Sequence, residues 1–174
     1  MNNEQRSFLD ATLPHLDALY RVAMHMSRDH HQAEDLVQET YLRAFSAFGT
    51  HRGTSAKAWL VAICLNLARS EGRRRARRVA ETSAGPGLEA EAAGPGVPER
   101  ALASIDRAAV SRALAGLPEE QRVAIVLMDL AGQSASEVAK MLECPRNTVL
   151  SRAHRGRQRL AAILVEEDLS RGMP

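Results

Sequence analysis

Residues 134–160 read SASEVAKML, then ECPRN, then TVLSRAHRGRQRL. Apolar side chains recur at helical spacing in the first segment, and Val149, Ala153 and Leu160 form an apolar edge along the last. Two short helices joined by a tight polar turn, the second rich in arginine, predict a helix-turn-helix whose second helix enters a DNA major groove. An ordinary surface helix with a solvated basic face is the alternative. The small helix and the turn that precede it favour DNA binding.

Arginine accounts for much of the remaining surface of the second helix, at Arg152, Arg155, Arg157 and Arg159. The planar guanidinium fork pairs in bidentate fashion with phosphate oxygens or with a guanine edge. The pattern therefore indicates DNA binding, without indicating which base sequence is read.

The composition of the 174-residue chain favours helices throughout. The hydrophobic share of 45% is enough for packed cores and argues against wholesale disorder. Aromatic residues make up only 3%, and strand-type runs of Val, Ile and Thr are missing. Ala, Leu, Arg and Glu dominate, and these residues have high helix propensity. We expect an all-α protein.

A glycine- and proline-rich segment divides the chain. Residues 80–98 read AETSAGPGLEAEAAGPGVP, which holds GPG twice and has little apolar surface to offset the entropy of ordering. We predict two small helical domains, residues 1–78 and 101–165, joined by a flexible linker at 79–100 and followed by a frayed tail at 166–174.

The net charge is only +2, but the charge is unevenly distributed. Residues 1–78 carry 12 basic and 8 acidic side chains, the linker carries 1 and 4, and residues 101–174 carry 10 and 9. Basic side chains gather at Arg73–Arg78 and Arg146–Arg159, as in proteins that bind nucleic acids. A solvated surface can gather charge in the same way, so the motifs must decide.

Helical spacing predicts three helices in the first domain. The first runs from about residue 4 to 27, with Pro14 kinking or splitting it. The second covers 32–47, and the third follows a glycine-punctuated loop and ends in the basic run. The apolar stripes include Phe8, Leu13, Leu16 and Leu19 in the first helix and Leu36, Val37, Tyr41, Leu42 and Phe45 in the second.

The sequence contains no signal for a metal site or for secretion. Cys64 and Cys144 lack partners at metal-ligand spacing, so two buried free thiols are expected, and any redox role stays undecided. The six histidines form no HExxH or comparable cluster. No apolar h-region begins the chain, and no apolar run approaches ~18 residues. We expect a cytoplasmic protein with no cofactor, metal or membrane insertion.

Three stretches, in this order, resemble the extracytoplasmic-function (ECF) class of bacterial sigma factors. AEDLVQETYLRAF at residues 33–45 resembles the region-two helix that grips the clamp helices of the RNA polymerase β′ subunit. RGTSAKAWLVAICLNLAR at residues 52–69 is similar to the segment that handles the promoter's −10 element. Residues 117–160, which include the helix-turn-helix, are similar to the region-four domain that reads the −35 element. Simple helix-turn-helix regulators share only the third stretch.

The resemblance implies a promoter-specificity subunit of RNA polymerase rather than an enzyme. Its implied partners are core RNA polymerase, through the β′ clamp helices and the β subunit, promoter DNA, and an anti-sigma factor. Acid and amide groups at neighbouring helical positions suit a basic partner helix. The residues implied in polymerase binding are Asp35, Gln38, Glu39 and Arg43.

The resemblance also implies two sets of DNA contacts. Those at the melted −10 element are His51, Arg52, Gly53, Trp59, Asn66, Arg69, Arg73 and Arg74. Those at the duplex −35 element are Arg146, Asn147, Thr148, Leu150, Ser151, Arg152, His154, Arg155 and Arg157.

The roles within these sets follow from side-chain chemistry. The Asn66 amide could bond the edge of a flipped base, although a plain surface asparagine is the alternative. Trp59 could stack a base, but its apolar stripe favours a core position. Arg152 and Arg155 are expected on the exposed side of the recognition helix, with Arg152 on phosphate and Arg146 reading a base.

Three positions depart from the family's pattern. His51 stands where an apolar aromatic often precedes Arg-Gly. Arg146-Asn147 stands where a small or apolar residue and glycine usually open the recognition helix, and Leu150 stands where many relatives have Arg or Lys. These departures concern which bases are read and leave the class of activity unchanged.

Two other classes of function stay open from the sequence. A two-domain regulator that binds duplex DNA without polymerase would account for the C-terminal half alone. An interaction protein whose domains mainly pack on a partner is the second alternative. Co-purification with core polymerase separates the sigma-factor hypothesis from both.

Overall fold

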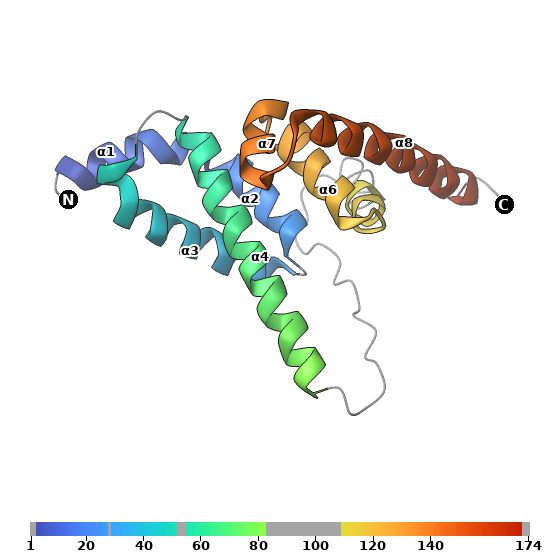
Figure 1. Ribbon diagram of the computed structural model, residues 1–174, viewed down its shortest axis with the longest axis horizontal. Coiled ribbons are helices and arrows are strands. Elements are labelled where there is room, and N and C mark those ends of the chain that lie inside the picture. The colour runs from blue at the N-terminus through green and yellow to red at the C-terminus, as the bar shows by residue number, and fades with distance from the viewer. Residues whose placement is uncertain (1–2, 28, 52–54, 83–108, 172–174) are drawn as a thin grey trace. The chain divides into compact units, whose positions relative to one another are not determined.

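The computed structural model describes residues 3–27, 29–51, 55–82 and 109–171. Helices make up most of these residues and no strand occurs among them, so the all-α prediction is confirmed. The chain divides into two compact units, Met1–Ala93 and Gly94–Pro174 (Figure 1). Residues 79–82 of the predicted linker are helical instead, and the rest of it, from Ser83 onward, lies outside the described residues.

Unit 1 is built from helices α1 to α4. α1 (Asn3–Thr12) and α2 (Leu16–Met26) are separated by the 3-10 turn η1 (Leu13–His15), so the first predicted helix is split at Pro14. Proline lacks the N–H that an uninterrupted helix would need there. α3 spans His30–Ala47, and the turn η2 (Phe48–Thr50) precedes α4 (Ala56–Thr82). α4, green in Figure 1, packs on both α2 and α3.

The core of unit 1 lies where α2, α3 and α4 meet. Leu19 and Val22 of α2, Leu36 of α3, and Leu60 and Leu65 of α4 are all at most 5% exposed. Burial of each such side chain stabilises the fold by roughly 1.5–3 kcal/mol relative to full exposure. These contacts hold the outward faces of α3 and α4 in a defined arrangement.

Phe8 attaches α1 to the end of α3 through aromatic contacts. Its ring packs edge-to-face on Tyr41, Phe45 and Phe48, with centroid distances of 5.9, 5.3 and 5.3 Å. The Tyr41 hydroxyl donates to the Thr12 carbonyl oxygen at 3.1 Å, which adds a polar contact at the same junction.

The sequence prediction was wrong about Leu42, which is 65% exposed instead of facing the core. The buried face of α3 runs through Ala33, Leu36, Thr40 and Ala44. At 100° per residue, Leu42 lies nearly opposite that face. The other apolar side chains that are more exposed than predicted are Leu13 at 50%, Leu16 at 37% and Phe45 at 38%. The predicted Leu36 and Val37 are buried, and the rest of the buried face consists of the small residues Ala33, Thr40 and Ala44.

Unit 2 begins, within its described part, with a helical stretch at 109–115. It continues through α6 (Glu119–Ile125), the π-helical turn η3 (Val126–Leu130), α7 (Ala135–Leu142) and α8 (Arg146–Arg171). The stretch at 109–115 ends at Gly116, and the apolar α6–η3 segment ends before Gly132, whose φ of 65° favours glycine. Each of these two helical segments therefore ends close to a glycine.

The core of unit 2 joins α6 to α8. Leu114, Leu117 and Ile125 are buried together, and Leu160 and Ile163 of α8 pack against them. α8 continues to Arg171, so the tail predicted as frayed from 166 onward is helical through that residue. None of the described helices is both long and apolar enough to cross a membrane.

Candidate nucleic-acid interface

A capping box starts the helix-turn-helix at α7. The Ser134 hydroxyl accepts from the Glu137 backbone N–H at 3.3 Å, and the Glu137 carboxylate accepts from the Ser134 N–H at 2.8 Å. These two bonds satisfy N–H groups that a helix N-terminus leaves without intrahelical partners. The start of α7 is therefore encoded locally in the sequence.

Backbone hydrogen bonds define the short turn between α7 and α8. Glu143 takes the left-handed conformation with φ 51°, and its N–H and that of Cys144 bond back to carbonyl oxygens of α7. The Pro145 carbonyl oxygen accepts from the Thr148 and Val149 N–H groups, so α8 begins at Arg146. Arg146 and Asn147 occupy the first turn of α8, in agreement with their expected place at the opening of the recognition helix.

One face of α8 packs on the rest of unit 2. Val149 and Ala153 are 0% exposed, and Gly156 is buried against Ile125 and Gln121 of α6. The opposite face is exposed and carries several residues implied in −35 recognition: Asn147, Leu150, Ser151, His154 and Arg155. Arg146 is also exposed, in the first turn of α8, but it lies in line with the buried Val149 and Ala153. Thr148 is half-buried, and its carbonyl oxygen accepts from the Ser151 hydroxyl at 2.9 Å.

The sequence predicted that Arg152 would lie on the exposed side of the recognition helix, and this prediction was wrong. Its side chain is only 20% exposed, and Nη2 lies 2.8 Å from Glu120 Oε1 of α6. Nη1 is also 3.9 Å from Cys144 Sγ. Cys144 itself is half-buried instead of buried. Sequence spacing could not reveal this arrangement, because Glu120 is far from Arg152 along the chain.

Arg157 is also held by an acid within unit 2. Its Nε donates to Asp129 Oδ2 at 2.9 Å and its Nη2 donates to Oδ1 at 2.7 Å. This hydrogen bonding, and then the Asp129 charge, raises the pKa of Arg157. Arg157 therefore stays cationic, with two donors already engaged.

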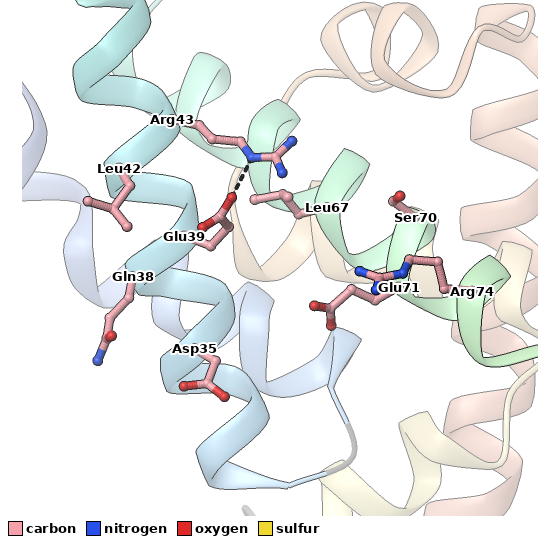
Figure 2. Close-up of a pocket in the computed structure, with 9 residues that line it drawn as sticks. All are labelled: Asp35, Gln38, Glu39, Leu42, Arg43, Leu67, Ser70, Glu71 and Arg74. Atoms are coloured by element: carbon pink, nitrogen blue, oxygen red, sulfur yellow. Dashed lines mark hydrogen bonds and ion pairs between the residues drawn. The ribbon is translucent and has the colours of Figure 1, made fainter. Parts of the chain in front are cut away.

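In unit 1, α3 and α4 form a groove of about 400 Å³ (Figure 2). α3 contributes the four residues implied in polymerase binding together with Leu42, and α4 contributes Leu67, Ser70, Glu71 and Arg74. Arg43 Nε donates to Glu39 Oε1 at 2.7 Å. The exposed Asp35 and Gln38 are the other two polar side chains that α3 contributes to the groove. Arg74, implied in −10 contact, thus lies with the polymerase set.

A second face of α4 carries the other −10 candidates. Trp59, Asn66 and Arg73 follow one another at seven-residue intervals, which puts them on one side of the helix. Asn66 and Arg73 are exposed, and Arg69 is half-buried. Arg52 and Gly53 lie outside the described residues.

His51 and Trp59 form a stacked pair at the start of this face. Their ring centroids are 4.2 Å apart with planes inclined by 18°. Trp59 is half-buried, so the core position favoured by the sequence is only partly correct. The fold thus brings together two residues that the resemblance implies in −10 contact.

Arg75 differs from the neighbouring arginines of the basic run because it is half-buried and bonded to α3. Its Nη2 donates to Gln32 Oε1 at 3.0 Å, and the Gln32 amide in turn donates to the Asp29 carboxylate at 2.7 Å. Asp29 also caps α3 through the Gln32 N–H at 2.8 Å. Arg75 thus ties α4 to the start of α3, a role that its place in a charge run did not indicate.

Two family models match the two units in order. Sigma-70 region 2 matches residues 13–78, and Sigma-70 region 4 matches residues 107–160. The ECF sigma factor EcfG of Rhodopseudomonas palustris is 34% identical over 91% of this chain and 85% of its own length. The chain belongs to the ECF group of the sigma-70 family. Both the resemblance and the predicted class are confirmed.

Other relatives of this sigma factor agree with that membership. The ECF sigma factor SigE of Mycolicibacterium smegmatis is 36% identical over 87% of this chain, which spans 59% of that relative's length. The solved sigma factor RpoE of Bartonella quintana, in complex with the anti-sigma factor NepR, is 34% identical with a TM-score of 0.78. That likeness covers 91% of this sigma factor and 97% of the solved chain.

Proposed function

We propose that this sigma factor binds core RNA polymerase through unit 1 and directs initiation at promoters by contacting a melted −10 element and a duplex −35 element. The supporting observation is that one chain carries both a charged α3–α4 groove within the region-2 match and an exposed basic helix within the region-4 match. We further propose residues 1–78 and 101–165 as the functional domains, with 79–100 as the linker between them.

The groove is our proposed contact for the β′ clamp helices. Asp35 and Gln38 offer an acid and an amide, and the exposed Leu42 lines the groove with them. Protein–protein interfaces commonly combine apolar contacts with a rim of polar groups. Glu39 and Arg43 form an ion pair, and a charged side chain of a partner could bind to either member of it. A further contact with the β subunit is part of the same proposal.

The outward face of α4 is our proposed −10 surface. A base taken out of the stack loses a few kcal/mol of stacking and pairing, which its new contacts must restore. The His51–Trp59 stack offers an aromatic plane, and Asn66 offers an amide donor and acceptor two turns after Trp59. Arg69 and Arg73 can bind backbone phosphates. Arg52 and Gly53 belong to this proposal from the resemblance alone.

The exposed face of α8 is our proposed −35 reader. Arg146 and Asn147 stand in the first helical turn, the part of a recognition helix that approaches base edges. Leu150, Ser151, His154 and Arg155 continue the exposed face, and Thr148 lies at its margin. Base-edge contacts in the major groove carry the sequence information, whereas phosphate contacts set the register.

We also propose an anti-sigma factor as a regulatory partner, action in the cytoplasm, and activity by binding rather than by catalysis. The solved RpoE chain is in complex with the anti-sigma factor NepR, and the solved CnrH chain is in complex with the cytosolic domain of CnrY. A polymerase subunit must meet its enzyme where transcription takes place.

In-vitro transcription with core enzyme and a randomised promoter library tests the proposal. We expect transcripts that depend on both reagents and that share a −35 and a −10 sequence. Tight duplex binding by the chain alone, with no transcript and no association with core enzyme, would instead support a stand-alone regulator.

A further inference from the structure

Two arginines of α8 are held by acids that precede it in the chain. Arg152 Nη2 lies 2.8 Å from Glu120 Oε1, and Glu120 stands in the first turn of α6. Arg157 donates to both carboxylate oxygens of Asp129, which belongs to η3. Both pairs lie wholly within unit 2, and both tie α8 to the segment on which it packs.

Arg152 and Arg157 occupy opposite edges of the exposed face of α8. This face is called the reading face below, because it carries most of the residues implied in −35 recognition. Arg152 and Arg157 are separated by about 140° around the helix, with the buried Val149 and Gly156 inside that arc. The exposed Asn147, Leu150, Ser151, His154 and Arg155 fill the remaining, wider arc, whereas Arg146 lies on the narrower arc in the first turn of α8. For a helix seated in a major groove, its two edges approach the two phosphate backbones. Arg152 and Arg157 therefore stand where phosphate contacts are expected, but each already has a carboxylate partner.

We infer that Glu120 and Asp129 withhold Arg152 and Arg157 from DNA phosphates and so limit the sequence-independent affinity of unit 2 for duplex DNA. This inference rests on the proposed −35 contact of α8. The acids act through the arginines and are positioning residues, since they touch no base themselves.

Counterion release explains why such a restraint matters. Sequence-independent affinity comes from cations that neutralise phosphates and displace condensed salt ions. A guanidinium whose charge is balanced by a carboxylate at hydrogen-bond distance presents a nearly neutral group to a phosphate. With both pairs intact, fewer cations contribute to the sequence-independent affinity for duplex DNA. Discrimination between DNA sequences then depends more on base-edge contacts such as that proposed for Arg146.

The test measures how salt affects binding of the full-length chain to a labelled duplex without promoter sequence. Fluorescence anisotropy across about 25–200 mM salt gives the slope of log K against log salt. Glu120→Gln and Asp129→Asn should each steepen the slope by ~0.9 and tighten binding roughly fivefold to tenfold near 0.1 M salt. Glu119→Gln is the matched control, because it removes an exposed charge one residue earlier in the same turn.

Second-site variants make the result specific. Adding Arg152→Gln to Glu120→Gln, or Arg157→Gln to Asp129→Asn, should return the slope to the wild-type value. The inference is overturned if both acid variants behave like Glu119→Gln, or if the arginine substitutions leave the steeper slopes unchanged. The two pairs are separate, so a folding defect in one variant leaves the other as the test.

One further variant separates this inference from the function on which it rests. Arg155 is exposed on the reading face and has no acid in its hydrogen bonds, which go to Ser151 of its own helix. Weaker duplex binding by Arg155→Ala supports α8 as the DNA-contacting helix, whatever the acid variants do. If Arg155→Ala and Arg146→Ala both bind as wild type does, the proposed −35 role itself fails.

Discussion

Gly156 of α8 lies so close to Ile125 of α6 that a β-carbon at Gly156 would stand 2.7 Å from Ile125 Cδ1. The same β-carbon would be 3.2 Å from Gln121 Cβ and 3.3 Å from the Gln121 carbonyl oxygen. The absence of a side chain thus sets how near the recognition helix approaches α6. This approach also brings Arg152 within reach of Glu120 on α6.

Gly156→Ala should therefore destabilise unit 2. Forcing extra volume into a packed interface costs about 1–3 kcal/mol, which outweighs the gain of ~1 kcal/mol in helix propensity from glycine to alanine. Urea unfolding followed by circular dichroism checks this. Gly72→Ala is the control, because Gly72 is exposed within α4 and a β-carbon there meets nothing within 4 Å. That variant should be as stable as wild type or slightly more stable.

Replacing Gln38 and Glu39 together by alanine should weaken binding to core polymerase by at least about tenfold. The substitution removes an exposed amide, and it also removes the carboxylate that holds Arg43 at 2.7 Å. Losing charge-assisted bonds at an interface commonly costs more than ~1.4 kcal/mol, which is a factor of 10 in affinity. A pull-down titration measures the affinity, with helix content checked separately. Asp10→Ala on α1 is the control, and equal affinity in both variants would contradict the groove assignment.

Arg146→Ala should relax base preference at one −35 position, whereas Arg155→Ala should weaken binding to all sequences about equally. A bidentate base contact discriminates by ~1–3 kcal/mol, and a phosphate contact carries no sequence information. Competition binding across single-base −35 variants, using polymerase holoenzyme, separates the two effects. A flattened position in Arg155→Ala, with a uniform loss in Arg146→Ala, would mean that the two roles are reversed.

Asn66→Ala should reduce discrimination at one −10 position without abolishing transcription. Asn66 is exposed on the face of α4 that also carries Trp59, so its amide can reach a base edge without disturbing the core. Arg73→Ala is the contrasting variant, since loss of a phosphate contact should lower transcription from all promoters alike. Transcription from promoters with single −10 substitutions checks both. If Asn66→Ala has the same −10 preference as wild type, Asn66 is an ordinary surface asparagine.

Only one of the two cysteines should react quickly with a thiol reagent near pH 8. Burial raises the pKa of the Cys64 thiol to about 12, whereas Cys144 is only half-buried in the helix-turn-helix. Because the reactive species is the thiolate, Cys64 should stay protected until the chain unfolds. In the unfolded chain this thiol ionises near its ordinary pKa of 9.0, but in the folded chain it does not. As the pH rises above 9.0, ionisation therefore favours the unfolded chain and lowers the free energy of unfolding. Labelling of Cys144→Ser at the wild-type rate would contradict this assignment.

Local sequence patterns determined the helices and their ends. Ser134 and Glu137 form a capping box, Pro14 splits the first helix, and Gly132 ends the apolar α6–η3 segment, each through an interaction within a few residues. The order of the three family-like stretches was also readable from the sequence. The family membership and the two-unit, all-α fold needed no contact between distant residues.

Tertiary structure alone decided which of these side chains are available. Arg152, Arg155 and Arg157 look alike in the sequence, but folding places Glu120 and Asp129 beside the first and the last. In the same way, Arg75 is tied to Gln32 while Arg74 faces the α3–α4 groove. The physical reason is that a charged side chain's availability depends on what lies within a few ångströms, and packing brings those neighbours from distant parts of the chain.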